Sequence, residues 1–243
     1  LGGEVVTRQV DICDASLLKK ALTSVEQSTG VIDGVFHAAG LAGGGMMTLR
    51  DQQAIEAVMA PKVLGLQSLT QFFESRKLDF MALFSSISAE MGDFGQADYS
   101  AANAYMDSAA DALGSSDVPI VAVNWDTWIG LGMSRKKWLE ESTVDEKGLS
   151  IEQALTLLPF ALGSGFSRLI ISTERLSARL NRLAKESNSE FLKASNLADS
   201  NHQSGKNKLQ PKQTRPSLAN PFVESTTEIE SLLSRIWQDL LGF

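Results

Sequence analysis

The residues best suited to acid and base chemistry in this sequence are a lysine, a serine, a tyrosine and an asparagine at defined intervals. Lys62 lies 24 residues before Ser86, Tyr99 follows Ser86 by 13 residues, and Asn103 follows Tyr99 by four. A phenol can give up a proton, and ammonium and hydroxyl groups can donate hydrogen bonds to an oxygen atom. If these four side chains converge at one end of a sheet, they could act together on a single carbonyl group.

The elements that must position these residues follow from the flanking pattern. Residues 80–84, FMALF, form a short apolar run that predicts a buried strand of a parallel sheet, and a pair of serines ends this run at Ser86. A glycine-containing loop leads into an Ala-rich segment, about 96–113, that predicts a helix. Tyr99 and Asn103 are four residues apart on that helix and therefore share one face.

Lys62 belongs to a longer helical pattern, about 49–75, in which Pro61 should cause a kink or a split. The apolar stripe of this pattern includes Lys62 and directs its side chain toward the sheet. Burying an unpaired ammonium group is costly, so the side chain either reaches an edge of the helix or is held by a partner and a ligand. Helix geometry alone favours the first alternative, whereas the spacing to Ser86 and Tyr99 favours a functional lysine.

This set of residues resembles the short-chain dehydrogenase/reductases and, within them, the ketoreductase domains of modular polyketide synthases. Those domains carry a serine in LFSS, a tyrosine 13 residues on, an asparagine four further, and an upstream lysine, here in APKVLG. The resemblance covers about residues 4–182. Four other segments agree with it: VDICD at 10–14, VFHAAG at 35–40, VNWDTW at 123–128 and GLGMS at 130–134.

Strand and helix patterns alternate along the chain, which predicts an α/β fold with a doubly wound, Rossmann-like parallel sheet. Residues 126–148 show no clean period and suit an active-site lid. Asp14 should cap the first helix. The expected strands are 4–10, 31–36, 80–84, 119–123 and 168–172, and the expected helices are 15–27, 49–75, 96–113, 150–162 and 174–182.

Polar and glycine residues gather where the expected strands end, at Asp11, at 37–40, at Ser86 and at Asn124. Ligands of open α/β sheets bind beyond the carboxyl ends of the strands, so these groups would line one crevice. Asp11 alone is equally well explained as a strand terminator, and HAAG at 37–40 as a tight turn. Their joint placement favours a ligand site.

The resemblance implies that NADPH delivers a hydride to a ketone. It also implies that Tyr99 donates the proton, that the ammonium of Lys62 stabilises the phenolate, and that Ser86 donates a hydrogen bond to the carbonyl oxygen. Asn103 would hold Lys62 or a relay water. Asp11 and Ile12 would meet the adenine, and 38–40 the ribose and phosphate region. The implied cofactor-binding residues are Asp11, Ile12, His37, Ala38, Ala39, Gly40, Asn124 and Trp125.

The implied substrate is a β-ketoacyl thioester tethered to a carrier domain, and the implied partners are neighbouring polyketide-synthase domains. One alternative is a free-standing reductase of a small ketone, whose chain would end soon after Arg182, whereas this sequence continues. A second alternative is a non-catalytic structural remnant. Loss of Tyr99 or Lys62 would favour the remnant, but both residues are present.

Composition argues against several other classes. The formal net charge of −7 disfavours a nucleic-acid partner. Cys13 is the only cysteine and there are two histidines, so neither an intramolecular disulfide nor a zinc site is expected, and we expect no metal. No apolar run approaches the roughly 18 residues of a membrane span, and no signal-peptide pattern opens the sequence, so we expect a cytoplasmic protein without a membrane partner.

The sequence predicts three parts. Residues 1–182 form the ketoreductase catalytic domain, which we expect to be amino-terminally truncated because it contains no G-x-G-x-x-G loop to hold phosphates. Residues 183–221, rich in Ser, Asn, Lys and Gln, predict a flexible linker. In 222–243, a capping box precedes an amphipathic helix that is similar to the first helix of an acyl or peptidyl carrier domain. A helix that packs on the reductase or binds a partner is the alternative.

Overall fold

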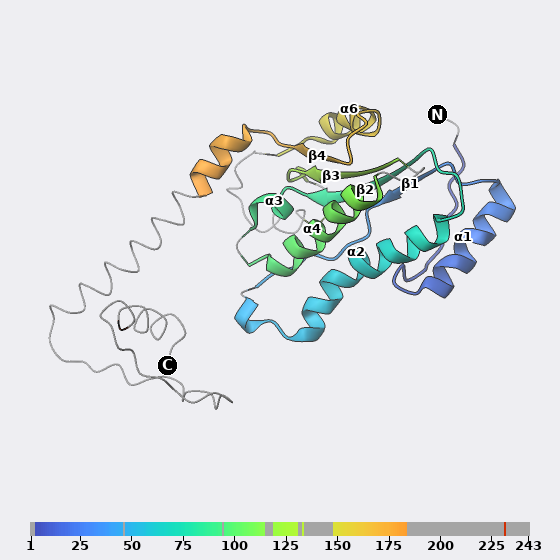
Figure 1. Cartoon of the computed structure of the whole chain (residues 1–243), viewed down its shortest axis with the longest axis horizontal. Helices are drawn as coiled ribbons and strands as arrows, with labels where there is room; N and C mark the ends of the chain where they lie inside the picture. Colours follow the sequence, from blue (N-terminus) through green and yellow to red (C-terminus); the bar gives the residue numbers. More distant parts are fainter. Residues whose placement is uncertain are drawn as a thin grey trace. The chain divides into compact units, whose positions relative to one another are not determined.

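The computed structural model describes residues 3–45, 47–93, 95–114, 119–130, 133, 148–183 and 231 (Figure 1). The chain divides into two compact units, Leu1–Leu183 and Ala184–Phe243, of which the second contributes only the helical Ser231 to the described residues. The linker and the carboxy-terminal helix expected from the sequence lie outside the described residues. So does most of the expected lid.

Four parallel strands form the sheet, and they pair in chain order β1-β2-β3-β4. Ser86 at the end of β2 lies opposite Trp125 of β3, which in turn lies opposite Ile171 of β4, so the carboxyl ends of these strands are level. The expected Rossmann-like parallel α/β arrangement is therefore confirmed. The strands are β1 (Gly34–His37), β2 (Phe80–Ser86), β3 (Ile120–Trp125) and β4 (Arg168–Ile171).

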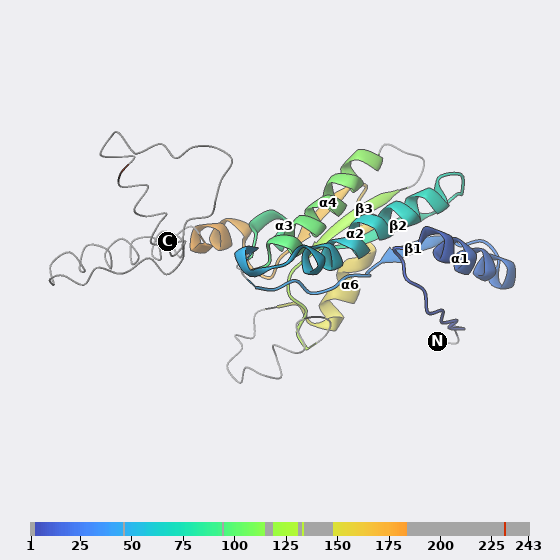
Figure 2. The same ribbon diagram turned by 90° about the horizontal axis from the view of Figure 1, so that it is seen from below.

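Helices cover both faces of this sheet, with α2 and α4 on one face and α6 on the other (Figures 1 and 2). The alternating side chains of β2 explain the two layers, because Met81 and Leu83 join the core beneath α2 and α4 while Ala82 joins the core beneath α6. The helices are α1 (Ala15–Thr29), α2 (Gln52–Phe73), α3 (Ser88–Met91), α4 (Ala97–Leu113), α6 (Ile151–Leu162) and a last helix at 176–183, with a 3-10 turn η1 at Met47–Leu49.

Side-chain caps begin three of these helices. Asp14 accepts hydrogen bonds from the backbone N–H groups of Ser16 and Leu17 at the start of α1, as its position in the sequence predicts. Asp51 caps α2, and Ser150 forms a capping box with Gln153 at the start of α6. Each of these caps fixes the residue at which its helix begins.

Two expectations about these elements are corrected. Residues 4–10 do not form a strand; they run as coil, and the side chain of Val5 is 85% exposed. A strand gains its hydrogen bonds only from a neighbour, and this segment pairs with none of the described strands. Of the two outcomes expected at Pro61, a kink or a split, the split does not occur: α2 continues through Pro61, and the exposed Ala57, whose carbonyl loses its helical donor, can bind water instead.

Among the described residues, no helix is both long and apolar enough to cross a membrane.

Candidate active site

Lys62 is inside the protein, at the point where β2 ends. Its side chain is 2% exposed, and its Nζ donates a hydrogen bond of 3.0 Å to the carbonyl oxygen of Phe84. The same Nζ lies 5.8 Å from the centroid of the Tyr99 ring. Gly40 makes this position possible, because a Cβ atom at residue 40 would lie only 3.0 Å from Lys62 Cε. The ammonium group thus remains next to Tyr99 and does not extend to solvent.

Burial lowers the pKa values of the two basic groups in this site. It lowers the pKa of Lys62 from its usual 10.5 to about 8, against the opposing attraction of the Asp107 carboxylate. Burial, together with the charge of Lys62, also lowers the pKa of His37 to about 4. The Pro61 carbonyl slightly favours protonation of His37, but neither ring nitrogen has a full hydrogen bond to the described residues. At neutral pH the site therefore contains an ammonium group beside an uncharged imidazole.

Tyr99 and Asn103 are placed by α4, one helical turn apart. Asn103 is fully buried, and its Nδ2 donates a hydrogen bond of 2.8 Å to the carbonyl oxygen of Tyr99. Its Oδ1 is buried and has no hydrogen-bond partner in the part of the chain that the structure describes. An unpaired acceptor at this depth is costly and suits a site that receives a donor, either an ammonium group or a water.

Ser86 is the last residue of β2 and is partly exposed. Its Oγ accepts hydrogen bonds from the backbone N–H of Ser88, at 3.2 Å, and from the hydroxyl of Ser88, at 3.0 Å. Both bonds use Ser86 as an acceptor, so its own hydroxyl proton remains available to a substrate oxygen. The short helix α3, which begins at Ser88, thus orients the Ser86 hydroxyl.

A buried polar group behind the site escaped the sequence analysis. Asp107 Oδ2 accepts a hydrogen bond of 2.6 Å from Asn124 Nδ2, which also donates to the Ser86 carbonyl oxygen at 3.3 Å. Burial raises the pKa of Asp107 above its usual value. The signal in the sequence was the spacing, because Asp107 follows Asn103 by four residues and continues the face of Tyr99 and Asn103.

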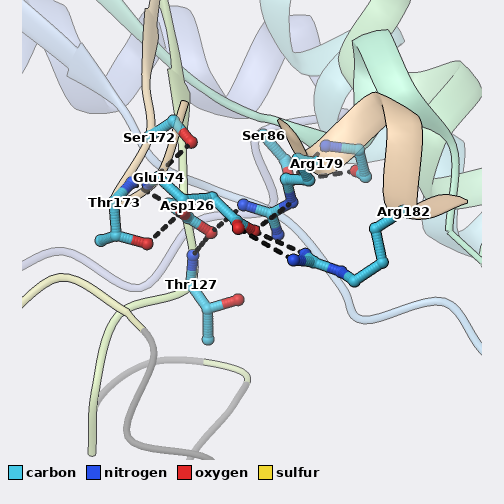
Figure 3. A network of polar contacts seen from close by, with 9 residues as sticks. Ser86, Asp126, Thr127, Ser172, Thr173, Glu174, Arg179 and Arg182 are labelled. Carbon is cyan, nitrogen blue, oxygen red and sulfur yellow. Dashed lines mark hydrogen bonds and ion pairs between the residues drawn. The ribbon is translucent and has the colours of Figure 1, made fainter. Parts of the chain in front are cut away.

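A second network, centred on Asp126, ties together the ends of β3 and β4 (Figure 3). The buried carboxylate of Asp126 accepts hydrogen bonds from Thr173 N at 3.0 Å, Thr173 Oγ1 at 2.8 Å and Arg179 Nη1 at 2.8 Å. Burial alone would raise the pKa of Asp126, but these donors hold it below its usual value. The network anchors the helix at 176–183 to the edge of the sheet where Ser86 lies.

The expected cofactor residues fall into two groups. Asp11 and Ala38 are exposed, and Ile12, Ala39 and Gly40 are partly exposed, so all five can meet a ligand directly. The other three residues are at most 5% exposed, backbone included, so a ligand cannot contact them directly. These three residues are His37, Asn124 and Trp125.

Residues 38–40 are small and at least partly exposed, and Gly40 lies directly beside Lys62, so these residues are compatible with a nicotinamide cofactor whose reactive end approaches Lys62. The Oδ1 of Asp11 accepts a hydrogen bond of 2.9 Å from the backbone N–H of Cys13. Within the 243 residues, no G-x-G-x-x-G loop is present for the pyrophosphate.

Sequence comparisons give a consistent result. A family model described as "KR domain" matches residues 1–130. Polyketide synthase PksN of Bacillus subtilis is 33% identical over 180 residues, which cover 70% of this chain and 3% of PksN. A 6-methylsalicylic acid synthase of Penicillium expansum is 31% identical over 153 residues, which cover 61% of this chain and 8% of that protein. The chain therefore spans a small fraction of these curated relatives.

Solved structures agree with the sequence comparisons. A ketoreductase domain from the bacillaene assembly line superposes with a TM-score of 0.62 at 25% identity, over 74% of this chain and 45% of that one. An amino-terminal ketoreductase from the macrolactin assembly line gives a TM-score of 0.59 at 26% identity, over 72% of this chain and 34% of that one. The chain spans less than half of either structure.

Proposed function

This chain belongs to the ketoreductase (KR) domain family found in polyketide synthases, and we propose that the gene product that contains it catalyses the NADPH-dependent reduction of a β-ketoacyl thioester to the β-hydroxyacyl thioester. Members of this family are nicotinamide-dependent oxidoreductases with a short-chain dehydrogenase/reductase fold. The observation that carries the proposal is the buried ammonium of Lys62, held at the end of β2 beside the Tyr99 ring.

In the proposed reaction the ketone carbon receives a hydride and the ketone oxygen receives a proton. NADPH supplies the hydride when bound and leaves as NADP⁺. The Ser86 hydroxyl donates a hydrogen bond to the carbonyl oxygen, and the Tyr99 phenol transfers its proton to that oxygen as the alcohol forms. The positive charge of Lys62 stabilises the negative charge of the resulting phenolate by electrostatic attraction.

Tyr99 must then recover its proton from solvent. The unpaired Oδ1 of Asn103 supports a role in this step, because it can accept a hydrogen bond from a relay water or from Lys62. The buried Asp107 and Asn124 act as positioning residues, since Asn124 donates to the Ser86 backbone and Asp107 fixes the Asn124 amide. Asp11, Ile12 and residues 38–40 would hold the cofactor.

The proposal includes the surroundings of the site. The acyl chain would arrive tethered to a carrier domain, and the partners would be other domains of a polyketide synthase. Residues 1–182 would be the reductase region, 183–221 a linker, and 222–243 a helix of carrier type. The similarity of the chain to parts of much longer synthases supports neighbouring synthase domains as partners.

The test uses the gene product that contains these 243 residues, with NADPH and a β-ketoacyl thioester. Tyr99→Phe should reduce turnover by at least about a hundredfold while NADPH binding persists, because only proton donation is removed. Tyr105→Phe is the matched control: Tyr105 is the other tyrosine of the chain and lies on the same helix, where its hydroxyl accepts a hydrogen bond from Gln67. Equal activity of Tyr99→Phe and the natural protein would refute the role of Tyr99. Turnover of a small free ketone but not of the thioester would refute the proposed substrate.

A further inference from the structure

Arg50 joins three segments that meet beside Tyr99. Its Nη1 donates a hydrogen bond of 2.7 Å to the carbonyl oxygen of Gly44, and its Nη2 donates to the carbonyl oxygen of Ala54 at 3.1 Å. The same Nη2 forms an ion pair of 2.5 Å with Asp98 Oδ2. The side chain of Arg50 is 18% exposed and that of Asp98 is 3% exposed, so solvent screens this pair far less than a surface ion pair.

Asp98 connects this ion pair to the backbone of the candidate proton donor. Its second oxygen, Oδ1, accepts a hydrogen bond of 2.8 Å from the backbone N–H of Tyr99. This N–H belongs to the first turn of α4, where helical N–H groups have no partner within the helix. One carboxylate thus binds Arg50 with one oxygen and the Tyr99 backbone with the other.

The glycine segment 43–45 packs directly against the same turn. A Cβ atom at Gly43 would lie 2.5 Å from Asp98 Oδ1 and 3.0 Å from Tyr99 Cβ, so only glycine allows this approach. Arg50 holds the segment in place through the Gly44 carbonyl. Gly43 therefore lies directly against Tyr99, and Arg50 fixes the residue that follows it; we call residues 43–45 the glycine wall.

We propose that Arg50 and Asp98 are positioning residues for the reduction, which fix Tyr99 and hold the 43–45 wall against it so that the wall limits the size of the group beside the ketone. This inference rests on the proposed function for its catalytic part. The Asp98 carboxylate restrains the Tyr99 backbone directly, and Arg50 restrains the residue that follows Gly43, which packs against the Tyr99 side chain.

The test compares Arg50→Met, Arg50→Lys, Asp98→Asn and the double variant Arg50→Met/Asp98→Asn in the gene product. Asp98→Asn retains an acceptor for the Tyr99 N–H but removes the charge. Arg76→Met is the matched control, because Arg76 also lies near an end of α2 and pairs with an acidic residue, Glu26, away from the site. The measurements are kcat and KM for an unbranched and an α-methyl β-ketoacyl thioester, the Kd for NADPH, and amide hydrogen exchange at 43–45.

We expect Arg50→Met to lower kcat by about tenfold to a hundredfold with little change in the Kd for NADPH, since small displacements of a catalytic group have effects of this size. The preference between the two thioesters should shrink, and amides at 43–45 should exchange faster. The kcat of Arg50→Lys should lie between those of the natural protein and Arg50→Met. The kcat of the double variant should be no lower than that of the more impaired single variant, because the two residues act as one unit.

Unchanged kcat and unchanged exchange in Arg50→Met would overturn the inference. So would additive losses in the double variant, or an equal loss of kcat in Arg76→Met. If the natural protein reduces neither thioester, the proposed function fails. The exchange data still decide whether Arg50 holds the 43–45 segment, so the two failures remain distinct.

Discussion

Replacing Lys62 by methionine should stabilise the fold at neutral pH and at the same time remove activity. At about 1.4 kcal/mol per pH unit, the fall in the pKa of Lys62 from 10.5 to about 8 corresponds to about 3 kcal/mol spent on keeping the ammonium buried. Methionine has a similar length and no charge. The variant loses the hydrogen bond to the Phe84 carbonyl, worth about 1 kcal/mol. The net gain in the free energy of unfolding should be about 2 kcal/mol.

The free energy of unfolding should change with pH in a direction that can be checked. Below pH 8, Lys62 carries its proton in both the folded and the unfolded protein, so the folded protein bears the full free-energy cost of burying the ammonium group. Between pH 8 and 10.5 the folded protein has released this proton while the unfolded protein still binds it, so stability rises with pH. The natural protein should therefore gain about 3 kcal/mol across this range relative to Lys62→Met.

The assay is urea unfolding of both proteins at neutral pH and at several values up to pH 10.5, with NADPH-dependent reduction measured in parallel. Lys20→Met, at an exposed position of α1, controls for the loss of a lysine in general. The reasoning is wrong if Lys62→Met is less stable than the natural protein at neutral pH. It is also wrong if both proteins show the same dependence on pH, because Lys62 would then not titrate at a lowered pKa.

Three further outcomes are expected. Asp107→Asn removes the negative charge that favours protonated Lys62, so the alkaline limb of the pH–rate profile should move to lower pH; an unmoved limb would show that Asp107 does not act on Lys62. Asp126→Ala should lower the free energy of unfolding by about 3 kcal/mol, measured in urea, because the backbone N–H and hydroxyl of Thr173 lose their acceptor and Arg179 keeps only the weaker pair with Glu174 at 3.9 Å; a change below about 1 kcal/mol would contradict this. The 243 residues on their own should bind NADPH only weakly, since they contain no glycine-rich loop for the pyrophosphate; micromolar affinity in a calorimetric titration would contradict this.

Elements that are specified by local chemistry were predictable from the sequence. The Asp14 cap and the period of 15–27 predicted α1, and the apolar run at 80–84 predicted the strand β2. The apolar stripe around Lys62 correctly directed its side chain inward. In each case the information lies within one helical turn or one strand, so the pattern alone is sufficient.

Features that depend on distant neighbours were not predictable in this way. The segment 4–10 has strand-like residues, but a strand also needs a partner, and whether one is present cannot be read from the segment itself. The pair Arg50–Asp98 joins residues 48 apart, and neither residue has a local pattern that points to the other. The helix face that carries Asp107 could be read from the sequence, but its hydrogen-bond partner Asn124 belongs to the strand β3.

The two buried basic groups explain over which pH range the site can work. His37 is uncharged above a pH of about 4, and Lys62 is charged below a pH of about 8, so between these limits the site carries a single cation. A protonated His37 would repel Lys62 and weaken its hold beside Tyr99, whereas an uncharged Lys62 could not stabilise a phenolate. Burial lowers both pKa values, and at neutral pH only Lys62 keeps its charge. The same desolvation that destabilises the fold therefore leaves one positive charge next to the phenol that must transfer its proton.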